Sequence, residues 1–130
     1  MTRRALTVSR ILLVLYLVTV FFLCFGKFEA GPDIQMSFWG IPTDKLVHFS
    51  MFLPFPPLVF FAFDGLRLGR RERLLAILSI LGAGILIAAA TETAQYFIPY
   101  RSGEWKDLFA DTLGLLASSC ILIPTLCRKD

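Results

Sequence analysis

Four long apolar runs constrain this chain more than any other feature of its sequence. They occupy residues 11–25, 46–63, 74–97 and 108–126 of a 130-residue chain. An α-helix rises about 1.5 Å per residue, so about 20 residues cross a hydrocarbon core of about 30 Å. A chain of this length cannot bury four helices that are apolar all round, which disfavours a soluble fold. With flanking residues, the expected membrane spans are 8–26, 45–63, 74–96 and 107–126.

Composition points to lipid as the solvent of this chain. The apolar fraction of 56% and the mean hydropathy of +0.69 exceed what a soluble domain of this size carries. No internal repeat or long linker divides the sequence. It therefore predicts a single all-α membrane domain over residues 1–130, built as a polytopic four-transmembrane-helix bundle.

The basic residues predict which ends of the spans face the cytoplasm. One set precedes or begins the first span, lies between the second and third spans, or follows the fourth: Arg3, Arg4, Arg10, Arg67, Arg70, Arg71, Arg73, Arg128 and Lys129. The other two loops hold only Lys27, Lys45, Arg101 and Lys106. The positive-inside rule then places both termini in the cytoplasm. This placement also accounts for the net charge of +3 without a nucleic-acid partner. No small-x-small cleavage site follows the first run promptly, so we expect the first span to be retained.

Cysteine and histidine usage gives no local metal or disulfide motif. Cys24, Cys120 and Cys127 show no C-x-x-C spacing, and His48 is the only histidine. The sequence therefore predicts no disulfide framework, no metal site and no cofactor.

Polar residues gather at the outer ends of the last two spans. In the third span, Gly84, Ala88, Thr91, Glu92 and Gln95 share one helix face, and in the fourth, Asp107, Asp111, Gly114 and Ser118 do the same. Ionisable groups at membrane depth are costly and usually face protein or a wet cavity. We expect the small residues of both faces (Gly84, Ala88, Gly114 and Ser118) to let these helices approach closely, which would bring the carboxylates together.

The second span begins with a charged pair and is then interrupted by prolines. Asp44 and His48 lie one turn apart, so Asp44 is expected to contact the imidazole, while Lys45 is expected to point elsewhere, toward a headgroup. Pro54, Pro56 and Pro57 remove backbone donors in mid-span, which predicts a kink or break. In the loop that follows the third span, Arg101 could hold Glu92 or Asp107, or an anionic ligand.

The order and spacing of these residues resemble the VanZ-like family of small bacterial membrane proteins. The resemblance rests on Asp44-Lys45-x-x-His48-Phe49, Glu92-x-x-Gln95, Arg101 six residues before Asp107, and Gly114 seven residues after it, and it covers approximately residues 40–118. It implies a multi-pass protein of the bacterial cytoplasmic membrane with an accessory role in teicoplanin-type glycopeptide susceptibility. Two positions depart from the expected pattern: Asp111 stands in place of asparagine, and Ser118 in place of a second glycine.

Three functional hypotheses follow, and the absence of a recognised catalytic signature favours a non-enzymatic accessory protein. Its outward-facing pocket would bind an anionic lipid or a cell-wall-related ligand, with membrane lipids, a lipid-linked cell-wall precursor or another membrane protein as partners. The binding candidates are Asp44, Lys45, His48, Glu92, Gln95, Arg101, Asp107 and Asp111. The alternative is a membrane hydrolase or phosphoryl-group transferase with His48, Glu92 and Asp107 as catalytic candidates. Transport is disfavoured because no polar stripe continues toward the cytoplasmic ends. A network that only specifies helix packing stays open.

Overall fold

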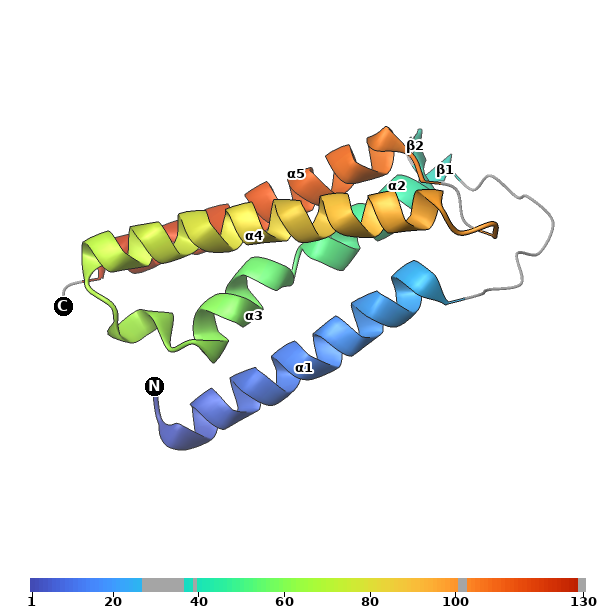
Figure 1. Ribbon diagram of the computed structural model, residues 1–130. Helices are drawn as coiled ribbons and strands as arrows, with labels where there is room; N and C mark the ends of the chain where they lie inside the picture. The colour runs from blue at the N-terminus through green and yellow to red at the C-terminus, as the bar shows by residue number, and fades with distance from the viewer. Residues whose placement is uncertain (27–36, 39, 101–102, 129–130) are drawn as a thin grey trace.

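Most of the described part of the chain is α-helical. The computed structural model describes residues 1–26, 37–38, 40–100 and 103–128. The helices are α1 (Arg3–Phe25), α2 (Thr43–Phe52), α3 (Phe55–Ala62), α4 (Arg70–Tyr96) and α5 (Trp105–Ile121), with 3-10 turns η1 (Gly65–Arg67) and η2 (Ile123–Cys127). Two-residue strands β1 (Ser37–Phe38) and β2 (Ile41–Pro42) pair antiparallel just before α2. The predicted all-α bundle is confirmed (Figure 1).

Four helical stretches are long and apolar enough to cross a membrane. They are Arg3–Phe25, Thr43–Ala62, Arg70–Tyr96 and Trp105–Cys127, and each contains most of one predicted span. Each has at least 20 residues, which is the length that a hydrocarbon core requires. The chain is therefore a multi-pass membrane protein.

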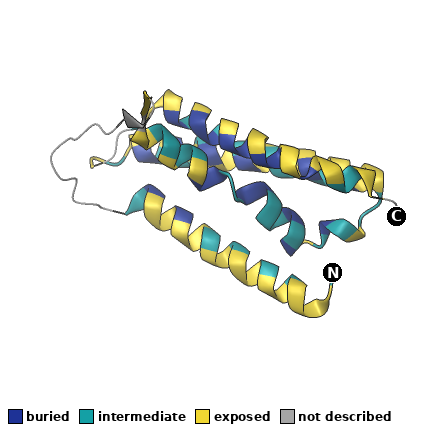
Figure 2. Cartoon of the chain, turned by 180° about the vertical axis from the view of Figure 1, so that it is seen from behind, coloured by how far each residue is buried: buried dark blue, intermediate teal, exposed yellow. Residues whose placement is uncertain are grey.

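The outside of the bundle is apolar, unlike that of a soluble protein, and several charged side chains are buried among the helices. Apolar side chains such as Leu86, which is 72% exposed, cover the outside, whereas Arg73 and Asp111 are each 1% exposed. Figure 2 shows exposed residues along the outer faces of α1, α4 and α5, with buried residues on the faces that meet. Lipid can solvate the apolar exterior, while charged groups gain by facing protein partners inside. The burial pattern therefore fits the membrane assignment.

The second span is broken where the prolines predicted a kink. α2 ends at Phe52 and α3 begins at Phe55, with Pro54 preceding the first turn of α3. Pro56 and Pro57 then fall in that first turn, where a missing backbone donor costs little. The break changes the direction of the chain, so α2 runs beside α5 and α3 turns toward α1 (Figure 1).

Two glycines admit close helix contacts, but with a different pairing from the expected one. A Cβ at Gly84 of α4 would lie 2.6 Å from a methyl carbon of Leu115, so α5 does approach α4 there. A Cβ at Gly114 would instead meet the backbone of Phe49 in α2. The small-residue faces of α4 and α5 therefore do not simply pack on each other. Leu115 fills the depression at Gly84, and Gly114 admits α2.

Hydrogen bonds fasten α1 to the rest of the bundle. Tyr16 donates to the carbonyl of Met51 (2.7 Å), next to the proline break. Gln95 and Tyr100 donate to the carbonyls of Cys24 (2.9 Å) and Phe25 (3.0 Å). The last carbonyls of a helix have no partner within that helix, so these side chains satisfy groups that would otherwise be exposed to lipid.

The two ends of the bundle differ in chemistry. Both termini and η1 lie at one end, and the start of α2, the end of α4 and the start of α5 lie at the other (Figure 1). At the first end, the buried Arg73 guanidinium donates to the carbonyls of Leu68 (2.8 Å) and Thr125. These contacts tie α4 to η2. The opposite end gathers the acidic side chains.

Candidate functional site

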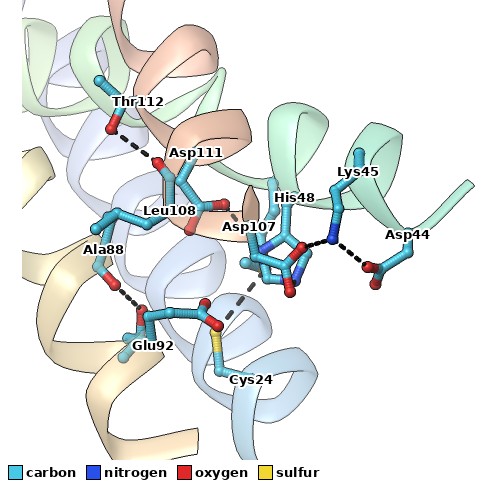
Figure 3. A network of polar contacts seen from close by, with 12 residues as sticks. Cys24, Asp44, Lys45, His48, Ala88, Glu92, Asp107, Leu108, Asp111 and Thr112 are labelled. Atoms are coloured by element: carbon cyan, nitrogen blue, oxygen red, sulfur yellow. Dashed lines mark hydrogen bonds and ion pairs between the residues drawn. The ribbon is translucent and has the colours of Figure 1, made fainter. Parts of the chain in front are cut away.

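Three helix ends bring the predicted polar residues of this chain into one cluster. The first turn of α2 carries Asp44, and the first turn of α5 carries Asp107. A helix N-terminus has partial positive charge, so a carboxylate in the first turn is favourably placed. Glu92 comes from the last turns of α4 and faces these two helix starts (Figure 3). The convergence of carboxylates at the ends of the spans is present in the structure.

Lys45 is the cation at the centre of the outer part of this cluster. Its ammonium lies 3.0 Å from Asp44 Oδ2 and 3.0 Å from Glu104 Oε2, and it also pairs with Asp107 Oδ1. The expectation that Lys45 points away from the cluster is wrong. The reason is the position of α5, whose first turn lies beside that of α2 and offers a buried carboxylate.

His48 lies between two aspartates of α5. Its Nδ1 is 2.9 Å from Asp111 Oδ1, and its Nε2 is 3.6 Å from Asp107 Oδ2. This short contact with Asp111 fixes the orientation of the imidazole ring. The expected contact with Asp44 is replaced by this one, because Asp44 pairs with Lys45. Packing of α2 on α5 thus decides the partner of the histidine.

Glu92 links the cluster to the start of α5. Its Oε1 accepts a hydrogen bond of 2.6 Å from the backbone amide of Glu104, the residue just before α5. Gln95, one turn further along α4, turns toward α1 and donates to Cys24. Glu92 therefore belongs to the acidic cluster, whereas Gln95 serves the contact with α1.

Two buried carboxylate oxygens in the cluster have no hydrogen-bond donor. They are Oε2 of Glu92 and Oδ2 of Asp111, and no residue in the part of the chain that the structure describes donates to them. A buried polar atom without a partner is expensive, particularly on a group that can carry charge. These two oxygens mark the innermost part of the cluster as incompletely satisfied.

Two hollows flank the cluster on different sides. A groove of about 760 Å³ runs between the end of α4 and the start of α5, and Glu92 and Glu104 line it. A smaller hollow of about 250 Å³ lies between α1, α2 and α4, and Asp44 and His48 line it together with Gln95. Each hollow reaches a different part of the cluster, so a ligand has two routes to these polar groups.

The site contains one residue that the sequence did not identify, and one predicted residue lies outside it. Glu104 joins the cluster through Lys45 and Glu92. Its position three residues before Asp107, at the start of the fourth apolar segment, was the available signal. Arg101 lies outside the described residues. Ser118, deeper along α5, is buried and hydrogen-bonds the carbonyl of Leu115 (3.4 Å), so it belongs to helix packing.

Comparison with known proteins identifies the family. A family profile described as VanZ/LLP1 matches residues 12–127. The chain belongs to the VanZ/LLP1 family. The match is wider than the expected range of 40–118, since it includes most of the first span, which the structure shows bonded to α2 and α4. No curated protein and no solved structure matches the chain.

The cluster of this VanZ/LLP1 protein carries more acidic than basic groups among the described residues. Its carboxylates belong to Asp44, Glu92, Glu104, Asp107 and Asp111. The ammonium of Lys45 contacts three of them, which leaves Glu92 and Asp111 with His48 as the nearest base. Such a site can accept hydrogen bonds from hydroxyl or amide groups, and it favours a cation over an anion at its innermost point.

Proposed function

We propose that this VanZ/LLP1-family protein binds the anionic, phosphate-bearing headgroup of an envelope amphiphile, as an accessory protein in envelope homeostasis or teicoplanin-type glycopeptide susceptibility. The protein would reside in the bacterial cytoplasmic membrane. The ligand class includes anionic lipids and lipid-linked cell-wall precursors, which share a phosphate next to a long apolar chain. The observation that carries the proposal is the groove of about 760 Å³ that connects the surface of the bundle to the acidic cluster.

The groove combines the chemistry that such a ligand needs. Its outer wall includes the aromatic side chains of Tyr96, Phe97 and Trp105, of which Trp105 is 85% exposed. Aromatic residues of this kind are enriched where a membrane meets water. Lys106 also lines the groove and could face a phosphate, while Glu92 and Glu104 could accept hydrogen bonds from sugar hydroxyls or amides. The apolar chain of the ligand would remain in the surrounding lipid.

The proposal requires the groove to face outward, and the charge distribution predicts that orientation. The basic starts of α1 and α4 lie at the end of the bundle opposite the acidic cluster (Figure 1). In a variant without native cysteines, Lys106→Cys should react with a membrane-impermeant maleimide in spheroplasts, and Arg70→Cys should react only after permeabilisation. The reverse labelling pattern would place the groove in the cytoplasm and end the proposal.

A binding measurement tests the ligand class. Purified protein in nanodiscs should bind a lipid-linked cell-wall precursor or phosphatidylglycerol in preference to phosphatidylcholine, as followed by native mass spectrometry. Trp105→Ala should weaken this binding about tenfold, because its large aromatic side chain lines the groove. Phe109→Ala is the matched control, since Phe109 is exposed on the same helix but does not line the groove. Equal retention of all three lipids, or equal losses in both variants, would contradict the proposal.

The placement of His48 favours one alternative, a hydrolase or phosphoryl-group transferase. Asp111 orients the imidazole through Nδ1, and Nε2 faces Asp107 at 3.6 Å, an arrangement that suits acid/base chemistry. In a hydrolase, Nε2 would take a proton from water as the water oxygen attacks the phosphorus of the bound lipid. The bond from phosphorus to the leaving oxygen would then break, and the imidazolium would return the proton to that oxygen. Release of phosphate from the lipid-linked precursor by the wild-type protein, and its loss in His48→Gln, would establish this alternative. Intact precursor after prolonged incubation would exclude it for that substrate.

A further inference from the structure

We propose that His48, Glu92 and Asp111 form a binding site for one divalent cation between α2, α4 and α5. The three residues come from three different helices, and one potential ligand atom of each lies within 4.8 Å of the other two. Figure 3 shows the two carboxylates and the imidazole pointing toward one another. Ligand atoms around a divalent transition metal lie about 2.0–2.2 Å from the ion, so a small closure of these side chains would bring all three into coordination range.

The unpartnered oxygens are a separate observation that points to the same ion. Glu92 is 7% exposed and Asp111 is 1% exposed, yet Oε2 of the first and Oδ2 of the second receive no hydrogen bond from any described residue. Water has little access to them. Buried carboxylates are normally hydrogen-bonded, paired with a base or bound to a metal. A cation between the two helices would satisfy both oxygens at once.

Charge balance favours a divalent ion at this position. Lys45 already contacts Asp44, Glu104 and Asp107. Glu92 and Asp111 have no contact with that ammonium; when both are ionised they carry two negative charges, and a neutral His48 adds none. One divalent cation makes these three side chains electrically neutral together. A single positive charge, such as that of a lysine, would leave one negative charge. Neutrality matters here because the group is buried in the end of a membrane bundle.

A second set of residues, Asp44, His48 and Asp107, also lies within ligand distance, but it is the weaker candidate. Its ligand atoms likewise fall within 4.8 Å of one another. Asp44 is exposed, however, and both of its acidic members contact the ammonium of Lys45. That positive charge repels a metal ion. A neutral imidazole offers only one lone pair, so His48 can serve only one of the two sites at a time.

The ligand types indicate which metals fit. One imidazole nitrogen and two carboxylates suit Zn²⁺ or Mn²⁺, whereas Ca²⁺ and Mg²⁺ prefer oxygen ligands alone. The sequence contains the residue types of a metal site but no ligand spacing motif, because the three ligands lie 44 and 19 residues apart. Only the packing of α2, α4 and α5 brings them together. The inference does not rest on the proposed lipid ligand.

Metal binding can be measured directly on the full-length protein. Protein purified in detergent and treated with a chelator should bind one equivalent of Zn²⁺ or Mn²⁺ by elemental analysis and calorimetry, and Ca²⁺ more weakly. Glu92→Gln and Asp111→Asn should each weaken binding about 100-fold, since each removes a charged ligand. Asp44→Asn is the matched control because it removes an acidic group of the same cluster, and its affinity should stay within about threefold. Wild-type protein without bound metal, or a loss confined to Asp44→Asn, would overturn the proposal.

A stability measurement separates a metal ligand from a packing residue. Metal should raise the thermal midpoint of the wild-type protein, because only the folded chain assembles all three ligands. Glu92→Gln keeps the shape of the side chain and removes one unpaired charge. Without metal it should melt at least as high as the wild-type protein, and added metal should not shift its midpoint. If it melts lower and wild-type protein shows no metal response, Glu92 has a structural role only. That outcome would not contradict the proposed lipid binding, which is measured separately.

Discussion

Gly114→Ala is expected to destabilise the bundle by about 3 kcal/mol, the upper part of the range for overpacking a tight interior contact. The new Cβ would overlap the carbonyl oxygen of Phe49 and lie 3.2 Å from its carbon and 3.4 Å from the nitrogen of Leu53. These are backbone atoms, so no rotamer change can make room. α2 and α5 would have to separate, which would also pull His48 away from Asp111. Unfolding in mixed micelles, followed by circular dichroism, measures the loss.

Gly82→Ala is the matched control for this prediction. Apart from its two neighbours in the chain and the backbone of its own helix, no described atom lies within 4 Å of a Cβ placed at Gly82, which is exposed in the middle of α4. Alanine favours a helix over glycine by about 0.8–1.0 kcal/mol in soluble hosts, so this variant should be neutral or slightly more stable. Similar losses in both variants would show that glycine itself, and not the contact between α2 and α5, sets the stability.

Lys45→Met is expected to cost about 3 kcal/mol and to disrupt the acidic cluster. Removing the ammonium leaves Asp107, whose side chain is 4% exposed, without its main counter-charge, and two further carboxylates lose a partner. Breaking a buried ion pair by deleting one member usually costs 3–5 kcal/mol, or about 3 where one partner keeps some solvent contact. The free energy of unfolding in mixed micelles is again the measurement.

The double variant Lys45→Met/Asp107→Asn tests the cause of that loss. Removing the orphaned charge should restore most of the stability, because the destabilisation comes from the unpaired carboxylate. Lys106→Met controls for the loss of a lysine near the same helix start, and its exposed side chain should make it neutral within about 0.5 kcal/mol. If the double variant is no more stable than Lys45→Met alone, the pair with Asp107 is not what stabilises this end of the bundle.

The sequence predicted part of the candidate site and missed its internal connections. The polar ends of the last two spans follow from helical spacing. Glu92 and Asp111 do come together, at His48, and Asp107 lies on the other side of the same imidazole. The partners were wrong at two positions: Lys45 contacts three carboxylates, and His48 bonds Asp111 in place of Asp44. Helical spacing predicts contacts only between residues of the same helix. The observed pairs join residues 45 to 107 and 48 to 111.

The sequence by itself determined the four spans, the lipid environment of the bundle and the break in the second span. Each depends on consecutive residues: the length of an apolar run, and the missing donors of Pro54, Pro56 and Pro57. The tertiary structure decided which side chains meet, because that depends on how each helix is rotated against its neighbours. Gly114 lets the backbone of α2 pack directly against α5, and Leu115 fills the space at Gly84. These contacts fix the helix rotations, and the rotations place His48 beside Asp111 and Glu92.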